Sequence, residues 1–303
     1  MPDGIGVMTV SRFQLQWEID IDNQGKLVRD FLKEQSISKS ALTDIKFAGG
    51  RICVNNHEVT VRRPLQTGDL LVVEFPLENR SDSLKGEELL LDILYEDDYV
   101  LILNKEAGIA TIPSREHPSG SLANGIIGYY EKKNHDATVH IVTRLDRDTS
   151  GLVLVAKHRH IHHLLSTQQR QGLIKRTYEA LAAGVFLHKK GTIEEPIGRK
   201  KGSIIARTVQ KEGQYACTHY EVLQQMEGFA HVRLMLETGR THQIRVHLSH
   251  IGHPLLGDDL YGGPVAAITR QALHCRSLAF IHPITQKSLL FQTSLPKDMQ
   301  GLV

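Results

Sequence analysis

Charged side chains with the potential for chemistry gather in a short stretch of this 303-residue chain. Residues 143–151 read TRLDRDTSG and lead directly into the apolar segment 152–156. A continuous apolar strand of this kind is typically buried on both faces, so the charged turn before it is attached to a rigid element. Such a turn is a suitable place for a catalytic group, and Arg144, Asp146, Arg147 and Asp148 supply its charged side chains.

A second stretch of this kind, residues 238–253, reads TGRTHQIRVHLSHIGH. Its apolar residues Ile244, Leu248 and Ile251 repeat at helical spacing, which predicts a helix with one face in the core. Arg245 then lies near the start of that helix.

Each candidate also has a simpler interpretation. Asp148 or Thr149 could cap a solvated turn. Tyr178, in the expected strand 175–180, is a further candidate. It could fill an edge position of that strand with its hydroxyl in water. Arg245 could form an ion pair at the surface, the more frequent fate of an arginine beside a helix start.

Together, the two stretches resemble the RluA-type pseudouridine synthases, which isomerise uridine within RNA. Further segments match family motifs, so the resemblance extends from about residue 12 to about residue 292; these segments are 105–114 (KEAGIATIPS), 175–180 (KRTYEA), 257–262 (GDDLYG) and 273–283. The family commonly has proline where this chain has Glu106, and usually histidine where it has Thr143.

The resemblance implies roles for five residues. Asp146 would be the catalytic carboxylate and Arg245 its partner. Arg144 would take the place of the flipped base, and Ile244 would form the apolar wall beneath the uracil. Tyr178 would stack on the target base. Asp146 could attack the sugar or the base covalently or deprotonate the ribose to release a glycal, and the sequence does not choose among these routes.

The implied reaction is an isomerisation and requires no cofactor. The sequence contains neither a P-loop nor a dinucleotide fingerprint. Seventeen histidines would suit a metallohydrolase, but they form no H-E-x-x-H pair, and we expect no metal site. A non-catalytic RNA-binding protein with the same fold is the third alternative; loss of Asp146 or Arg245 would indicate it, and both are present.

Composition is that of an ordinary globular protein, with 41% hydrophobic residues and a net charge of +2. No apolar run reaches the length of a membrane span and the N-terminal residues do not resemble a secretion signal, so we expect a cytoplasmic protein with no membrane contact and no obligate protein partner. Cys53, Cys217 and Cys275 are too far apart for a disulfide framework or a thiolate zinc site and are expected to act as small buried hydrophobic residues.

The pattern predicts a small N-terminal domain at residues 12–76. Its expected elements are a helix containing Leu27 to Leu32 with Asn23 as its cap, a helix from Ser38 through Ile45, strands Ile52–Val54 and Val59–Val61 around a turn at 55–57, and a strand Leu70–Phe75. This order resembles the small α/β RNA-binding domain first known from ribosomal protein S-four. The candidate RNA contacts are Lys39, Lys46, Arg51, Arg62 and Arg63.

Residues 77–88 are polar and without an apolar period, which predicts a linker to a catalytic domain at 89–303. There we expect strands at 93–96, 100–104 and 175–180, a helix at 161–168, and a basic loop at 189–211 that either contacts phosphates or is a solvated hairpin. The resemblance implies an α+β fold: a mixed, mainly antiparallel sheet with a central active-site cleft. Its implied substrate is structured RNA; we favour ribosomal RNA because the N-terminal module resembles those of enzymes that modify it, and transfer RNA is the alternative.

Overall fold

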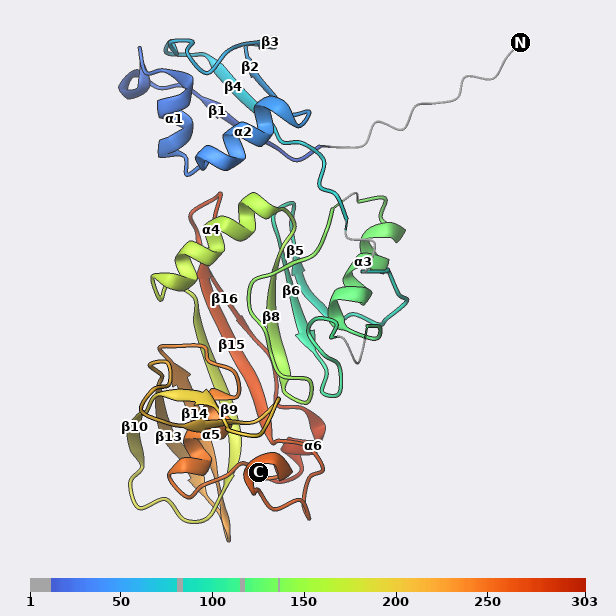
Figure 1. The fold of residues 1–303 in the computed structure, drawn as a ribbon, viewed down its shortest axis with the longest axis vertical. Coiled ribbons are helices and arrows are strands. Elements are labelled where there is room, and N and C mark those ends of the chain that lie inside the picture. Colours follow the sequence, from blue (N-terminus) through green and yellow to red (C-terminus); the bar gives the residue numbers. More distant parts are fainter. Residues whose placement is uncertain (1–11, 81–83, 115–117, 136) are drawn as a thin grey trace, which may run out of the picture.

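The computed structural model describes residues 12–80, 84–114, 118–135 and 137–303 (Figure 1). Within these residues the strands form a four-stranded sheet, a ten-stranded sheet and a separate two-stranded hairpin. The four-stranded sheet lies at one end of the molecule with two short helices, and the large sheet extends away from it (Figure 1). The architecture is α+β, as expected.

The small sheet has the strand order β1-β4-β2-β3 and is antiparallel throughout. Its elements are β1 (Gln14–Glu18), η1 (Ile21–Asn23), α1 (Val28–Glu34), α2 (Lys39–Phe47), β2 (Arg51–Val54), β3 (His57–Glu58) and β4 (Leu70–Glu74). The hydroxyl of Ser38 accepts a hydrogen bond from the Ala41 N–H at 3.1 Å, so this predicted cap is confirmed. The predicted cap at Asn23 is wrong, because Asn23 ends η1 and α1 begins only after Leu27.

The small hairpin is tighter than predicted. Its turn consists of Asn55 and Asn56 alone, with φ of 50° and 66°, which is the left-handed backbone that two-residue hairpins need and asparagine tolerates. His57 therefore already pairs with Val54. The predicted strand at residues 59–61 is absent. The pairing of β2 with β3 ends before these residues, and their apolar side chains pack against the core of the small sheet.

The large sheet has the order β10-β13-β14-β9-β15-β8-β6-β5, with β16 and β7 paired beside this path. Its strands are β5 (Ile93–Glu96), β6 (Val100–Lys105), β7 (His140–Ile141), β8 (Ser150–Ala156), β9 (Lys175–Ala183), β10 (Lys190–Glu194), β13 (Cys217–Gln225), β14 (Phe229–Leu236), β15 (Leu273–Ile281) and β16 (Ser288–Gln292). All described pairings in it are antiparallel except that of β8 with β15. The sheet is thus mixed and mainly antiparallel.

The remaining elements cover or extend this sheet. They are α3 (Leu122–Lys132), α4 (Arg159–Arg170), α5 (Gln243–His250), η2 (Asp259–Tyr261), α6 (Lys297–Gln300) and the hairpin strands β11 (Ile197–Arg199) and β12 (Arg207–Val209). The helices predicted at 161–168 and from Gln243 correspond to α4 and α5. The basic segment forms β10 and the β11–β12 hairpin rather than one continuous loop.

Strand β8 lies in the middle of the core, and all seven of its residues are buried, as its sequence predicted. Gly151 is required where β8 runs parallel to β15. Its φ is +113°, and a Cβ atom there would lie 2.3 Å from the carbonyl oxygen of Cys275. This close approach aligns the start of β8, and therefore the charged turn before it, with the neighbouring strand.

The described part of segment 77–88 contains no helix or strand, but it is not free of contacts. The Glu78 carboxylate lies 2.8 Å from the Nε2 atom of His140 and accepts a hydrogen bond from the Arg159 N–H at 2.8 Å. Phe13 stacks on His158 with ring centroids 4.0 Å apart. A cavity of about 750 Å³ lies at this junction between the small sheet and the large one.

No helix in the described ranges is long and apolar enough to cross a membrane. The thiols of Cys217 and Cys275 are buried and Cys53 is partly exposed; all three cysteines are free. Two of the three thus match the expected role as buried hydrophobic residues.

Candidate active site

The turn that carries Asp146 is held by side chains on both sides of it. The hydroxyl of Thr143, which replaces the family's usual histidine, is buried and accepts a hydrogen bond from the Leu154 N–H of β8 at 2.9 Å. The hydroxyl of Thr111 donates to the Leu145 carbonyl at 2.7 Å. Leu145 itself is buried, so the charged residues around it point away from the core.

Lys105, at the end of β6, also holds the turn that carries Asp146. Its ammonium group is buried and donates to the carbonyl oxygens of Glu106, Ile109 and Arg147 at 2.7–2.9 Å. Burial lowers the pKa of this lysine to about 7. The three contacts of Lys105 with main-chain carbonyls are those of a structural support.

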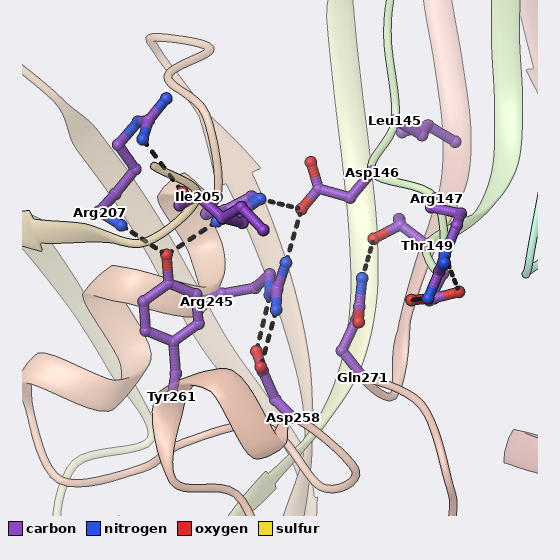
Figure 2. A network of polar contacts seen from close by, with 12 residues as sticks. Leu145, Asp146, Arg147, Thr149, Ile205, Arg207, Arg245, Asp258, Tyr261 and Gln271 are labelled. Atoms are coloured by element: carbon purple, nitrogen blue, oxygen red, sulfur yellow. Dashed lines mark hydrogen bonds and ion pairs between the residues drawn. The ribbon is translucent and has the colours of Figure 1, made fainter. Parts of the chain in front are cut away.

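Asp146, Arg245 and Asp258 form the polar centre of the site (Figure 2). Arg245 donates from NH1 to Oδ2 of Asp146 at 3.2 Å, and from Nε and NH2 to the two carboxylate oxygens of Asp258 at 2.7 and 2.8 Å. The Arg245 side chain is only 8% exposed, so the interpretation as a surface ion pair is wrong.

The charge of Arg245 is secured by its partners. Burial opposes that charge, but the hydrogen bonds and the charge of Asp258, together with the charge of Asp146, outweigh it and raise the pKa of the guanidinium. A permanently charged arginine therefore faces the Asp146 carboxylate. Sequence reasoning did not single out Asp258; the GDDLYG segment was its one signal, as a match to a family motif.

Two further residues complete this network. His242 precedes α5 with a left-handed backbone (φ 57°), and its Nδ1 atom lies 2.8 Å from the Tyr261 hydroxyl. Its Nε2 atom lies 3.8 Å from Oδ2 of Asp146. The Tyr261 ring lies under the Arg245 guanidinium, 4.9 Å from ring centroid to Cζ, a cation–π contact. Neither residue was predicted from the sequence.

Tyr178 lies inside the sheet, on β9 between β14 and β15, so its interpretation as an edge residue is wrong. The residue is 4% exposed, and its hydroxyl accepts a hydrogen bond from NH1 of Arg176 at 3.0 Å. Burial raises the pKa of the phenol, which therefore stays protonated at neutral pH.

A pocket of about 80 Å³ lies beside Asp146. All five residues of the predicted catalytic centre line it: Arg144, Asp146, Tyr178, Ile244 and Arg245. Arg144 is exposed, whereas Ile244 and Tyr178 are buried. The pocket thus combines a partly exposed carboxylate with an apolar and aromatic wall, the surroundings that a flat, polar-edged base requires.

The predicted RNA contacts of the small domain are exposed to different degrees. Lys39, Lys46 and Arg62 are exposed. Arg51 forms a bidentate ion pair with Glu74, and Arg63 is only partly exposed, with NH2 3.9 Å from Asp69. None of the five lines the pocket beside Asp146. Sequence reasoning missed Phe47, which is 77% exposed with the Lys46 ammonium over its ring.

Within the described residues, one side-chain group has the composition of a metal site: Cys217, His219 and Glu237. The imidazole and carboxylate of this trio already contact each other directly, with His219 Nε2 and Glu237 Oε1 at 2.7 Å. The trio does not line the pocket. The described histidines in and around α4 and α5 belong to no such group.

The chain is similar in sequence to several known proteins. The RNA pseudouridylate synthase family matches residues 99–250. An uncharacterized RNA pseudouridine synthase of Bacillus subtilis, YjbO, is 54% identical over 91% of this chain and 98% of its own length. Ribosomal large subunit pseudouridine synthase D of Pseudomonas aeruginosa is 38% identical over 84% of this chain and 83% of its own.

Among solved structures, the human RNA pseudouridylate synthase domain containing 1 protein shares the fold. Its TM-score is 0.57 at 24% identity, over 69% of this chain and 85% of that one. The chain belongs to the RluA-type RNA pseudouridine synthases and is an isomerase. The fold and the enzyme class implied by the two charged stretches are thereby confirmed.

Proposed function

We propose that this enzyme isomerises uridines in structured ribosomal RNA with Asp146 as its single catalytic carboxylate. The observation that carries the proposal is the contact of Asp146 with Arg245, a buried arginine whose charge is maintained by Asp258. Among the described residues, Asp146 is the one carboxylate that lines the pocket, and its side chain is 27% exposed, so a nucleotide can reach it.

The surrounding residues would serve the base after it leaves the RNA stack. Tyr178 and Ile244 supply flat and apolar surfaces for the uracil. Arg144 is exposed and lines the pocket, where its planar guanidinium can stack in the vacated space and hydrogen-bond to the partner base. The first step is either covalent attack by Asp146 or deprotonation of the ribose.

Ribosomal RNA is the proposed substrate class for two reasons. Several relatives 36–38% identical to this chain carry the name ribosomal large subunit pseudouridine synthase D. The small sheet domain, proposed to comprise residues 12–76 and to be joined through 77–88 to the catalytic domain 89–303, exposes Lys39, Lys46 and Arg62. Cations of this kind contact phosphates, and the exposed ring of Phe47 offers a surface on which a base can stack.

A pseudouridine map of total RNA tests this proposal. The map is compared between cells with the gene, cells without it, and deleted cells that carry either the wild-type gene or the Asp146→Asn variant. We expect one or more sites in ribosomal RNA to lose pseudouridine on deletion and to regain it only with the wild-type gene.

Two outcomes contradict the proposal in different ways. Restoration of the sites by Asp146→Asn would exclude the carboxylate as the catalytic group. Loss of sites in transfer RNA alone would leave the carboxylate in place but overturn the substrate class. Asp148→Asn, a change of the next carboxylate in the same turn, is the matched control and should restore the sites fully.

A further inference from the structure

The backbone of His242 has an unusual conformation that the neighbouring residues in the sequence do not explain. It adopts φ 57° and ψ 20°, a left-handed conformation that is strained for a side chain with a Cβ atom. This backbone directs the ring between the Tyr261 hydroxyl and Asp146, at 2.8 Å from Nδ1 and 3.8 Å from Nε2. Strain of this kind persists where surrounding contacts determine the geometry, and it clusters at functional sites.

The hydrogen bonds of Tyr261 favour one tautomer of the His242 ring. The Tyr261 oxygen accepts a hydrogen bond from the Arg207 N–H of β12 at 2.9 Å (Figure 2). Its own proton is then free to be donated to Nδ1 of His242, which leaves the proton of the neutral ring on Nε2. The opposite tautomer would direct the Nε2 lone pair at the Asp146 carboxylate, an electrostatically unfavourable arrangement.

Charges around the ring favour its neutral form. Burial lowers the pKa of His242, and the nearby guanidinium groups of Arg245 and Arg207 act in the same direction, against the carboxylates of Asp146 and Asp258. A neutral ring with Nε2–H toward Asp146 is therefore the state that satisfies all of its neighbours.

We propose that His242 is a positioning residue for Asp146. Its Nε2–H and NH1 of Arg245 both approach Oδ2 of Asp146, so together they would hold that oxygen and leave Oδ1 directed at the nucleotide. Arg245 alone gives one contact at 3.2 Å, about which the carboxylate can rotate. This role requires the separation of 3.8 Å to shorten to a hydrogen bond when the substrate binds, a change that catalytic contacts commonly undergo.

This inference rests on the proposed role of Asp146, and the test separates the two. In the wild-type protein, ¹⁵N NMR of histidine-labelled enzyme at neutral pH reads the tautomer directly, with the His242 signals identified by their loss in His242→Asn. We expect a protonated Nε2 and an unprotonated Nδ1. In Tyr261→Phe, which lacks the donor to Nδ1, this pattern should shift toward the other tautomer.

Turnover is measured as tritium release from unmodified ribosomal RNA transcripts labelled at C5 of uridine, because that hydrogen leaves when C5 bonds to the sugar. Asparagine tolerates the left-handed backbone but lacks a group at the Nε2 position. His242→Asn should therefore lower kcat about 10- to 100-fold, the effect of one lost hydrogen bond to a charged group, with RNA affinity within about twofold. His242→Gln, whose amide reaches the Nε2 position, should recover part of the loss.

His250→Asn, an exposed histidine at the end of the same helix, is the control and should behave as the wild type. Wild-type turnover in His242→Asn, or a proton on Nδ1 in the wild-type enzyme, would overturn the inference. Turnover by Asp146→Asn would instead overturn the proposed function. If His242→Asn fails to fold, the loss of the same signals in His242→Gln identifies them, and the tautomer measurement still tests the inference.

Discussion

The buried ammonium group of Lys105 donates a hydrogen bond to the carbonyl oxygen of Arg147 at 2.9 Å. Arg147 directly follows the candidate catalytic residue Asp146 in the chain. Two more carbonyls, of Glu106 and Ile109, accept its other protons. Among the described residues Lys105 contacts no carboxylate, and its contacts join one family motif to the next, so it is a structural support for the Asp146 turn.

This support predicts a specific dependence of stability on pH. Burial lowers the pKa of folded Lys105 from 10.5 to about 7, so between pH 7 and 10 the unfolded chain binds the proton and the folded chain does not. The free energy of unfolding of the wild type should then rise with pH relative to Lys105→Met, by at most about 1.4 kcal/mol per pH unit. Urea unfolding of both proteins at pH 7, 8 and 9 measures the difference. A difference independent of pH would mean that the carbonyls keep the lysine charged.

Asp258→Asn should damage both stability and turnover. The change removes the charge that balances Arg245 in a buried position, and breaking a buried ion pair in this way costs about 3 kcal/mol. Arg245 would also lose the fixed orientation that directs NH1 at Asp146. Urea unfolding and tritium-release assays report the two effects. The exposed neighbour Asp259 provides the control, and an equal loss in Asp259→Asn would refute the explanation.

Tyr178→Ala should slow turnover more than it weakens RNA binding. The ring lines the pocket, whereas the proposed contacts that hold the RNA lie mainly on other surfaces. The truncation also removes a buried aromatic side chain and should reduce stability by about 3–5 kcal/mol, so folded protein must be verified first. Tyr178→Phe keeps the ring and loses only the hydroxyl that accepts from Arg176. If affinity falls as far as turnover in Tyr178→Ala, the ring acts in binding.

Removal of exposed cations from the small domain should change the salt dependence of binding. Each phosphate contact contributes roughly 0.7–0.9 to the slope of log affinity against log salt, so Lys39, Lys46 and Arg62 replaced together by alanine should lower the slope by about 2. Binding to ribosomal RNA transcripts at several salt concentrations measures it. Replacement of Lys132, Lys287 and Lys297, exposed lysines of the catalytic domain, is the charge-matched comparison. An equal loss of slope in both triples would disprove a specific role of the small domain.

Local patterns in the chain were sufficient for much of the fold. The apolar run of β8 predicted a strand buried on both faces, and the spacing of Ile244 and Leu248 predicted α5, because burial of side chains follows the period of the backbone. The resemblance of the sequence motifs to one family identified five of the residues that line the pocket. Ser38 as a helix cap was equally local and equally correct.

Local patterns did not predict the positions of residues that depend on neighbours distant in sequence. The place of Tyr178 in the middle of the sheet follows from the strand order, which no single strand encodes. The tight turn at Asn55 and Asn56 was misjudged by one residue, because pairing with β2 decides where β3 begins.

Residue types and local periodicity thus predicted the main elements, and the resemblance of the sequence motifs to one family predicted the enzyme class and the candidates for the pocket. Tertiary structure alone decided how these candidates are oriented. Arg245 meets Asp146, 99 residues earlier, and is held by Asp258, while Lys105 supports the turn from 42 residues before Arg147. The physical reason is that the charge and the direction of a side chain depend on burial and on partners that only the packed sheet brings together.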